Sequence, residues 1–303
     1  MNELIRIFLN ILLPIFLIAG TGYLLSRFLK IDPRPLSQIA FNLFSPFLVF
    51  NLLTEGDFGG LDILRIMTFA FVLIILIGGI TWVVGKLLRV KRRVFIGMML
   101  ATMFMNAGNY GLPVVLFAFG ETGLSAASAF FVTNAILVYT LGVVIASSNS
   151  AKLSSAFGNL LKVPTIYALL LALVFIYTGW EIPLPIARSA KLLGDASIPS
   201  LLVLLGMQLH YSTGSKELMP MGIVSIIRLV VSPVLAFLLI PFFGITGVAR
   251  PSLIVESAMP SAILSTLIAM EYDVEPSFVT AVVFLTTIIS PITLTLLLRL
   301  LGA

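Results

Sequence analysis

The sequence predicts an all-α, polytopic membrane protein. Hydrophobic residues make up 59% of the 303 residues and charged residues only 10%, whereas a soluble domain carries roughly 25% charged residues. The mean hydropathy is +1.15. Apolar stretches of about 20 residues, the length that crosses a bilayer as a helix, recur along nearly the whole chain. The strands of a transmembrane barrel would instead alternate over about 10 residues, and the sequence shows no such alternation.

Short polar loops divide the apolar stretches into ten expected spans. The first stretch begins almost at Met1 and is too long for the core of a signal peptide, so we expect it to be retained as a span. The sequence therefore predicts a multi-pass protein of the cell membrane. The expected spans are 4–27, 35–54, 63–87, 94–118, 124–147, 157–179, 186–208, 219–243, 249–270 and 276–301.

Composition and motifs argue against an enzyme, a cofactor protein and a nucleic-acid-binding protein. The chain has no cysteine and a single histidine, His210, so clustered thiolate or imidazole ligands are excluded. It also lacks a phosphate-binding loop with Lys-Ser/Thr, His-Glu-x-x-His and Gly-x-Ser-x-Gly. The isoelectric point of about 9.6 reflects basic residues in short loops beside spans, which set membrane orientation. We therefore expect no bound cofactor apart from a coupling ion.

The chain reads as two similar halves, 1–147 and 157–303, joined by a serine-rich link at 148–156. Because each half has five spans, an odd number, the second half must enter the membrane from the opposite side. That is an inverted repeat, a plan shared by many secondary transporters. The prolines that support it are Pro14, Pro33 and Pro35, which recur 150 residues later as Pro164, Pro183 and Pro185, together with the pairs Pro46 and Pro199, and Pro113 and Pro260.

The positive charges predict the orientation of the spans. Lys and Arg concentrate in the loops after odd-numbered spans, above all in the cluster at 86–93. The other loops carry acids such as Glu55, Glu121 and Glu181 with few basic residues. Since positively charged short loops stay in the cytoplasm, both termini are expected on the extracytoplasmic side.

Span 4 contains a polar, glycine-rich segment at 106–113 that we expect to break the helix. Asn106 and Asn109 are three residues apart and share a face, Gly111 permits close approach, and Pro113 removes a backbone donor. Broken helices at membrane depth are tolerated only where protein or a water-filled cavity surrounds them. A substrate site built from these residues is one interpretation. A proline kink with asparagines bonding between helices is the other.

Span 9 contains a second break at 256–261. Glu256 precedes Pro260 and Ser261, and an ionisable group inside a span is a functional hypothesis by default. Glu256 would bind Na⁺ or exchange H⁺ as the coupling ion. Structural pairing with a nearby polar side chain is the alternative. Paired interrupted spans are the best pointer in sequence to a central transport site, so we expect Pro260 and Ser261 to adjoin the substrate.

Four further residues are candidates of lower weight. Thr133 and Asn134, near the centre of span 5, are read either as ion ligands beside Glu256 and Asn109 or as contacts between helices. Asp195 in span 7 is a secondary candidate for a coupling acid, with an interfacial acid as the alternative. Arg228 in span 8 would meet a substrate carboxylate or, as we expect, extend to the cytoplasmic interface.

The breaks also carry a family resemblance. The sequence resembles the auxin efflux carrier family of permeases, within the bile, arsenite and riboflavin transporter superfamily. The resemblance covers essentially the full length and implies ten helices in two inverted repeats. It further implies that spans 4 and 9 cross, that a transport domain moves against a scaffold, that Asn106 contacts a substrate carboxylate, and that the protein is a homodimer. The motifs that carry it lie at 106–120, 256–260, 271–273 and 286–293.

The break in span 9 also resembles that of the bile acid–sodium symporters. Glu256-Ser-Ala-Met matches their Glu-x-x-Met pattern, in which the glutamate is a sodium ligand. Plant auxin carriers tend to have glutamine at that place. The resemblance therefore implies cation coupling through Glu256.

Together these features predict a secondary transporter of small organic anions that works by alternating access among membrane lipids. The substrate would bind Asn106, Asn109, Gly111, Pro113, Pro260 and Ser261, and the coupling ion would bind Glu256, Asn109, Thr133 and Asn134. A membrane sensor or sterol-binding module on the same fold, which does not move its ligand, is the alternative. Flux into proteoliposomes separates the two.

Overall fold

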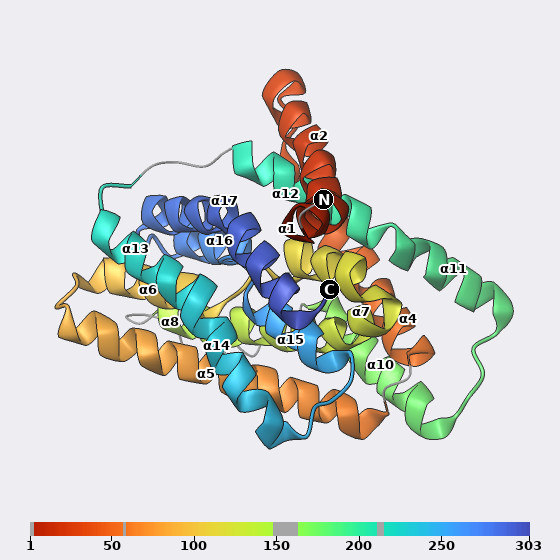
Figure 1. Ribbon diagram of the computed structural model, residues 1–303. Coiled ribbons are helices and arrows are strands. Elements are labelled where there is room, and N and C mark those ends of the chain that lie inside the picture. Colours follow the sequence, from red (N-terminus) through yellow and green to blue (C-terminus); the bar gives the residue numbers. More distant parts are fainter. Residues whose placement is uncertain (1–2, 57–58, 148–162, 211–214) are drawn as a thin grey trace.

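The computed structural model describes residues 3–56, 59–147, 163–210 and 215–303, and their regular elements are all helical (Figure 1). Within these ranges the single β-bridge joins Met105 to Ser261. The expectation of an all-α protein is confirmed. The link predicted at 148–156 lies outside the described residues.

Helices of the first half often run through short π-helical or bent turns, so one span comprises several elements. They are α1 (Glu3–Ile7), η1 (Phe8–Leu12), α2 (Leu13–Leu29), α3 (Pro33–Ile39), η2 (Ala40–Phe44), α4 (Ser45–Glu55), α5 (Gly60–Leu87), α6 (Arg92–Met103), η3 (Ala107–Gly111), α7 (Leu112–Leu137), η4 (Val138–Gly142) and α8 (Val143–Ala146).

The described elements of the second half are also helical. Its elements are α10 (Pro164–Thr178), α11 (Leu184–Asp195), α12 (Ser197–His210), α13 (Leu218–Ile226), η5 (Ile227–Val231), α14 (Ser232–Leu239), η6 (Ile240–Phe243), α15 (Ala249–Ser257), α16 (Ile263–Glu271) and α17 (Pro276–Leu301).

Seven continuous helical segments among the described residues are long and apolar enough to cross a membrane. The segment Ala107–Ala146 contains a kink at Gly120, whose backbone φ of 68° only glycine adopts readily. α6, α15 and α16 have 12, 9 and 9 residues, and each alone is shorter than a span. The seven segments are Glu3–Leu29, Pro33–Glu55, Gly60–Leu87, Ala107–Ala146, Leu184–His210, Leu218–Phe243 and Pro276–Leu301.

Prolines widen these helices more often than they break them. Pro14, Pro46, Pro113 and Pro233 each occupy the first turn of an α-helix that directly follows a π-helical turn. A proline ring crowds the carbonyl four residues before it and offers no donor, and a widened turn relieves that clash. The expectation that Pro113 breaks span 4 is therefore wrong. The helix is interrupted earlier, at 104–106.

The helices pack in two groups, and each group draws on both halves of the sequence (Figure 1). In the first, called the scaffold group, α2 packs on α12 and α4 packs on α10 and α11. Gly22 and Gly206 allow the α2–α12 contact, because an added Cβ would lie 2.0 Å from the carbonyl oxygen of Val203 and 1.6 Å from that of Ala19, respectively. The second, called the core group, comprises α5, α6, α7, α14, α15, α16 and α17.

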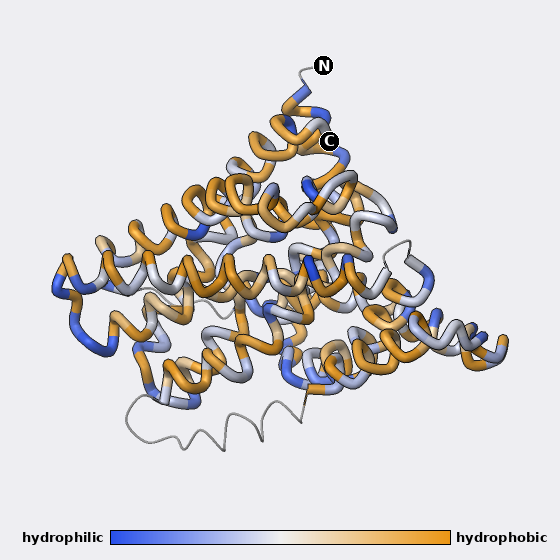
Figure 2. The backbone as a smooth tube through the Cα atoms, turned by 90° about the horizontal axis from the view of Figure 1, so that it is seen from below, coloured by the Kyte–Doolittle hydropathy of each residue, from blue (hydrophilic) through white to orange (hydrophobic). Residues whose placement is uncertain are grey.

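Ion pairs join helix ends and the loops beside them. Glu3 and Arg299 are 3.0 Å apart, so the ends of α1 and α17 lie together. Figure 2 shows hydrophobic residues along almost every helix, with hydrophilic segments mainly in the connections. Two more pairs join the N-terminal end of α6 to the loops before α13 and α17. They are Lys91–Glu217 and Arg93–Asp273.

Candidate functional site

The two interrupted helices meet through their backbones. α6 ends at Met103 and α15 ends at Ser257, and the extended segments that follow them lie antiparallel. The amide of Asn106 donates to the carbonyl of Pro260 at 2.8 Å, and the amide of Ala262 donates to the carbonyl of Phe104 at 2.9 Å. These bonds satisfy backbone groups that lipid could not. The two breaks predicted from sequence therefore form one crossing.

Polar side chains from neighbouring spans complete this crossing. The side-chain amide of Asn134 bonds both backbone groups of Met105. Its Nδ2 donates to the Met105 carbonyl at 3.0 Å, and its Oδ1 accepts from the Met105 backbone amide at 3.4 Å. On the other side, the hydroxyl of Thr286 accepts from the amide of Ser261 at 3.2 Å. Asn134 and Thr286 thus hydrogen-bond to the backbones of the two extended segments, as a neighbouring strand would. The Ser261 hydroxyl donates to the carbonyl of Ala101 at 2.7 Å.

Two asparagines beside the crossing keep unused hydrogen-bonding atoms. The Nδ2 of Asn106 and the Oδ1 of Asn109 are buried without a partner among the described residues. Asn109 Nδ2 donates to the Oε1 of Gln208 at 3.1 Å. Asn106, Asn109, Asn134 and Gln208 line a cavity of about 20 Å³, room for roughly one water molecule or one small ion. A donor and an acceptor in one small cavity can hold a polar ligand.

Glu256 lies against the start of the helix on the far side of the crossing. Its side chain is fully buried, and neither carboxylate oxygen has a hydrogen-bond partner among the described residues. The carboxylate contacts the α-carbon of Gly111, where an added Cβ would lie 2.3 Å from Oε2 and 2.6 Å from Oε1. A buried charged carboxylate without partners is costly. A proton or a cation bound at this position would neutralise it.

Comparison with known proteins identifies the family of the chain. Residues 7–298 match the profile of the family described as Membrane transport protein. The chain belongs to this family. It is 27% identical over 268 residues to an uncharacterized transporter of Methanothermobacter thermautotrophicus, covering 88% of each chain. It is also 28% identical over 240 residues to an uncharacterized transporter of Methanocaldococcus jannaschii, covering 76% of each. The protein is therefore a membrane transporter and not an enzyme.

The crossing of this transporter adjoins a larger cavity of about 300 Å³, called the inner cavity because it adjoins the crossing. Phe41, Phe131, Ala135 and Leu264 line both this cavity and the small one beside Asn106. The inner cavity extends to Glu271, at the end of α16. A ligand at the asparagines would therefore approach from the side that carries the loop between α16 and α17.

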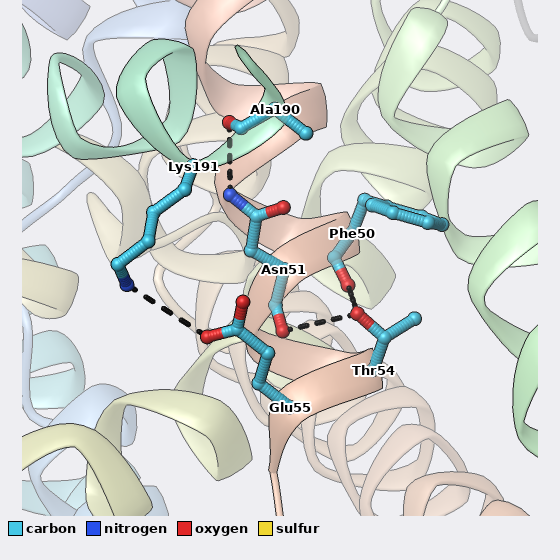
Figure 3. Close-up of polar contacts among 6 residues, drawn as sticks. All are labelled: Phe50, Asn51, Thr54, Glu55, Ala190 and Lys191. Atoms are coloured by element: carbon cyan, nitrogen blue, oxygen red, sulfur yellow. Dashed lines mark hydrogen bonds and ion pairs between the residues drawn. The ribbon is translucent and has the colours of Figure 1, made fainter. Parts of the chain in front are cut away.

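A separate cavity of about 480 Å³, called the outer cavity because it lies away from the crossing, lies between the scaffold group and the part of α7 on either side of Gly120. Asp195 lines it and is exposed, together with Glu55, Glu121 and Lys191. Figure 3 shows how α4 and α11 are joined there: Asn51 Nδ2 donates to the carbonyl of Ala190 at 2.9 Å, and Lys191 lies 3.8 Å from Glu55. The structure thus places Asp195 away from the crossing.

The other residues predicted to bind the substrate or the ion do not all lie at the small cavity. Pro113 is buried in the first turn of α7, and Pro260 contributes its backbone carbonyl to the crossing. The Thr133 hydroxyl donates to Ala129 in its own helix at 3.0 Å. Glu256 and Thr133 do not line the small cavity that holds Asn109 and Asn134. Among the described residues, no group of three or more His, Cys, Asp or Glu side chains could hold a metal.

Sequence reasoning missed Gln208 and misjudged Arg228. Gln208 follows the apolar run of α12, and its polarity there was a usable signal. Arg228 was expected to reach the cytoplasmic interface, and this is wrong, because its side chain is fully buried. Its guanidinium donates to backbone carbonyls of α6 and α15, partners that no residue pattern reveals.

Proposed function

We propose that this transporter is a secondary carrier that moves small organic anions across the cell membrane by alternating access, coupled to Na⁺ or H⁺. One observation carries the proposal. At the crossing of two interrupted helices, Asn106, Asn109 and Glu256 hold buried polar atoms without partners among the described residues. Since buried polar groups are normally paired, such a cluster is expected where a ligand and an ion bind.

Ten spans in two inverted repeats account for the contacts between the halves. Asn106 and Ser261 both redirect their amides at the crossing, and Asn134 and Thr286 hold the two extended segments from the spans that follow. The ion pair of Glu3 with Arg299 supports an even number of crossings. With the basic loops in the cytoplasm, both termini would be extracytoplasmic and the inner cavity would open to the cytoplasm.

The substrate would bind on the asparagine side of the crossing. The Asn106 amide offers a donor to a carboxylate, and the first turns of η3 and α16 face the crossing with the positive ends of their helix dipoles. An anion is therefore favoured over a cation at this position. The size of the inner cavity suits a small organic acid.

The ion would bind Glu256. A carboxylate buried against Gly111 is neutralised either by a proton or by a cation coordinated with nearby backbone oxygens. Alternating access would follow if the core group, which carries both breaks, moved against the scaffold group. The two groups meet where α4 and α12 of the scaffold group pack on α7 of the core group, and across the outer cavity.

Ligand screening followed by flux measurement tests the function. Purified protein is heated with a panel of organic acids, with and without Na⁺ and at two pH values, and acids that raise the melting temperature are then assayed for uptake into proteoliposomes. We expect at least one carboxylate to raise the melting temperature and to be taken up. Acids that bind without flux would instead favour a sensor, and uptake of organic cations alone would contradict the anion preference.

Asn106→Ala supplies the residue-level test of the substrate site. Loss of one hydrogen bond to a charged group costs about 1.5–3 kcal/mol, so the apparent affinity for the acid should fall about tenfold or more. Asn51→Ala is the matched control, because Asn51 bonds Ala190 at the outer contact between α4 and α11. Unchanged substrate affinity in Asn106→Ala would remove Asn106 from the site.

A further inference from the structure

Arg228 joins the ends of the two half-helices that lead into the crossing. It lies in η5, and it is among the largest fully buried side chains. Its Nη1 donates to the carbonyl of Thr102 at 2.6 Å, and its Nη2 donates to the carbonyl of Ser257 and to the hydroxyl of Ser232. That hydroxyl also donates to the Ser257 carbonyl at 2.7 Å. One guanidinium thus contacts the last turns of both α6 and α15.

The two carbonyls need a partner because the crossing takes their normal ones. In a continuous α-helix, Thr102 would accept from the amide of Asn106, and Ser257 from that of Ser261. Instead the Asn106 amide donates to Pro260, and the Ser261 amide donates to Thr286. Each helix therefore ends inside the protein with an unpaired carbonyl and the negative end of its dipole. Arg228 supplies donors and positive charge to both.

In the part of the chain that the structure describes, no carboxylate balances this charge directly. None of the ion pairs among the described residues includes Arg228, and Glu256, next to Ser257 in the chain, makes no bond to it. In transporters with broken helices, mobile cations bind the exposed carbonyls at half-helix C-termini. Here a side chain fills that position.

We propose that Arg228 is a tethered cation that replaces a mobile ion at the C-terminal ends of α6 and α15. It is a positioning residue: it fixes both half-helices in the register that lets Asn106 pair with Pro260. The charge of the two helix ends is then compensated permanently, and Glu256 is left as the buried group that responds to an external ion. Only the transport readout of this proposal rests on the proposed function.

Chemical rescue provides the test. Arg228→Ala leaves a space lined by two carbonyls and the Ser232 hydroxyl, which should accept free guanidinium. We expect the full-length variant to melt at a lower temperature than wild type, and guanidinium chloride at low millimolar concentration to raise that temperature more than choline chloride does. Uptake should recover in parallel. Arg250→Ala is the matched control, because Arg250 is exposed and stacks 5.3 Å from the ring of Phe237.

A second pair of variants separates charge from packing. Arg228→Met keeps most of the volume and removes the charge, while Arg228→Lys keeps the charge and loses the planar fork. We expect the lysine variant to retain more of the wild-type melting temperature and uptake than the methionine variant. A buried charge with only a packing role is often replaced by an apolar residue without loss. A methionine variant as stable as the lysine variant, or an alanine variant that guanidinium leaves unchanged, would overturn the proposal.

Discussion

The carboxylate of Glu256 contacts the α-carbon of Gly111, so the two interrupted helices are in contact through a side chain as well as through their backbones. A Cβ at this position would overlap both carboxylate oxygens, so a larger residue would have to displace the Glu256 side chain. This contact places the buried acid of one interrupted helix at the start of the next half-helix of the other. A change in the charge of Glu256 therefore acts directly on the backbone where η3 continues into α7.

Gly111→Ala is predicted to disturb ion coupling and stability together. The added methyl group must displace the carboxylate, and overpacking of this kind costs about 1–3 kcal/mol. Gly79→Ala is the control, since nothing lies within 4 Å of a Cβ at Gly79. Thermal unfolding and uptake under an imposed ion gradient would check both effects. A Gly111→Ala protein that resembles Gly79→Ala in both assays would show that the contact is not needed.

Asn134→Leu is predicted to destabilise the crossing. The substitution leaves the amide and carbonyl of Met105 without the partner that now bonds both, and a buried unsatisfied group costs about 1–3 kcal/mol. Thr133→Val should be close to neutral, because the Thr133 hydroxyl bonds only within its own helix. Thermal melting of the two variants gives the comparison. Equal melting temperatures would contradict a structural role for Asn134.

Gly206→Ala is predicted to disrupt the scaffold group. A methyl group there would lie 1.6 Å from the carbonyl oxygen of Ala19, a backbone atom that cannot turn aside. We expect the free energy of unfolding to fall by about 3 kcal/mol or more, or the protein to fail to fold. Gly20→Ala, in the facing helix, meets nothing within 4 Å and should be tolerated. Yields of monodisperse protein and melting temperatures decide the matter; a well-folded Gly206→Ala protein would mean that α2 and α12 are farther apart.

The sequence was informative at three polar residues that interrupt apolar stretches. Asn106, Asn109 and Glu256 stand out because polar residues are costly inside apolar stretches, and the structure brings all three to the crossing. The family was likewise recognisable from these motifs. The all-α class followed from hydropathy alone, since bilayers admit few other structures.

Other features left no readable trace in the sequence. Proline marks both a widened turn at Pro113 and an extended segment at Pro260, and which one occurs depends on whether another backbone lies beside it. Arg228 binds carbonyls contributed by distant helices, and every residue has a carbonyl. The partnership of Asn134 with Met105 depends on how α7 returns past the crossing after Gly120. Such features require the three-dimensional arrangement.

Uptake by Glu256→Gln under an imposed gradient tests the central claim most directly. A tenfold gradient of the coupling ion supplies about 1.4 kcal/mol per ion, enough for about tenfold accumulation of a substrate moved without net charge. Wild-type protein and Asp195→Asn, whose side chain lies at the outer cavity, should accumulate the acid when a Na⁺ or pH gradient is applied. Glu256→Gln should equilibrate it without responding to either gradient. Full gradient-driven accumulation by Glu256→Gln would contradict the assignment of this residue as the coupling group.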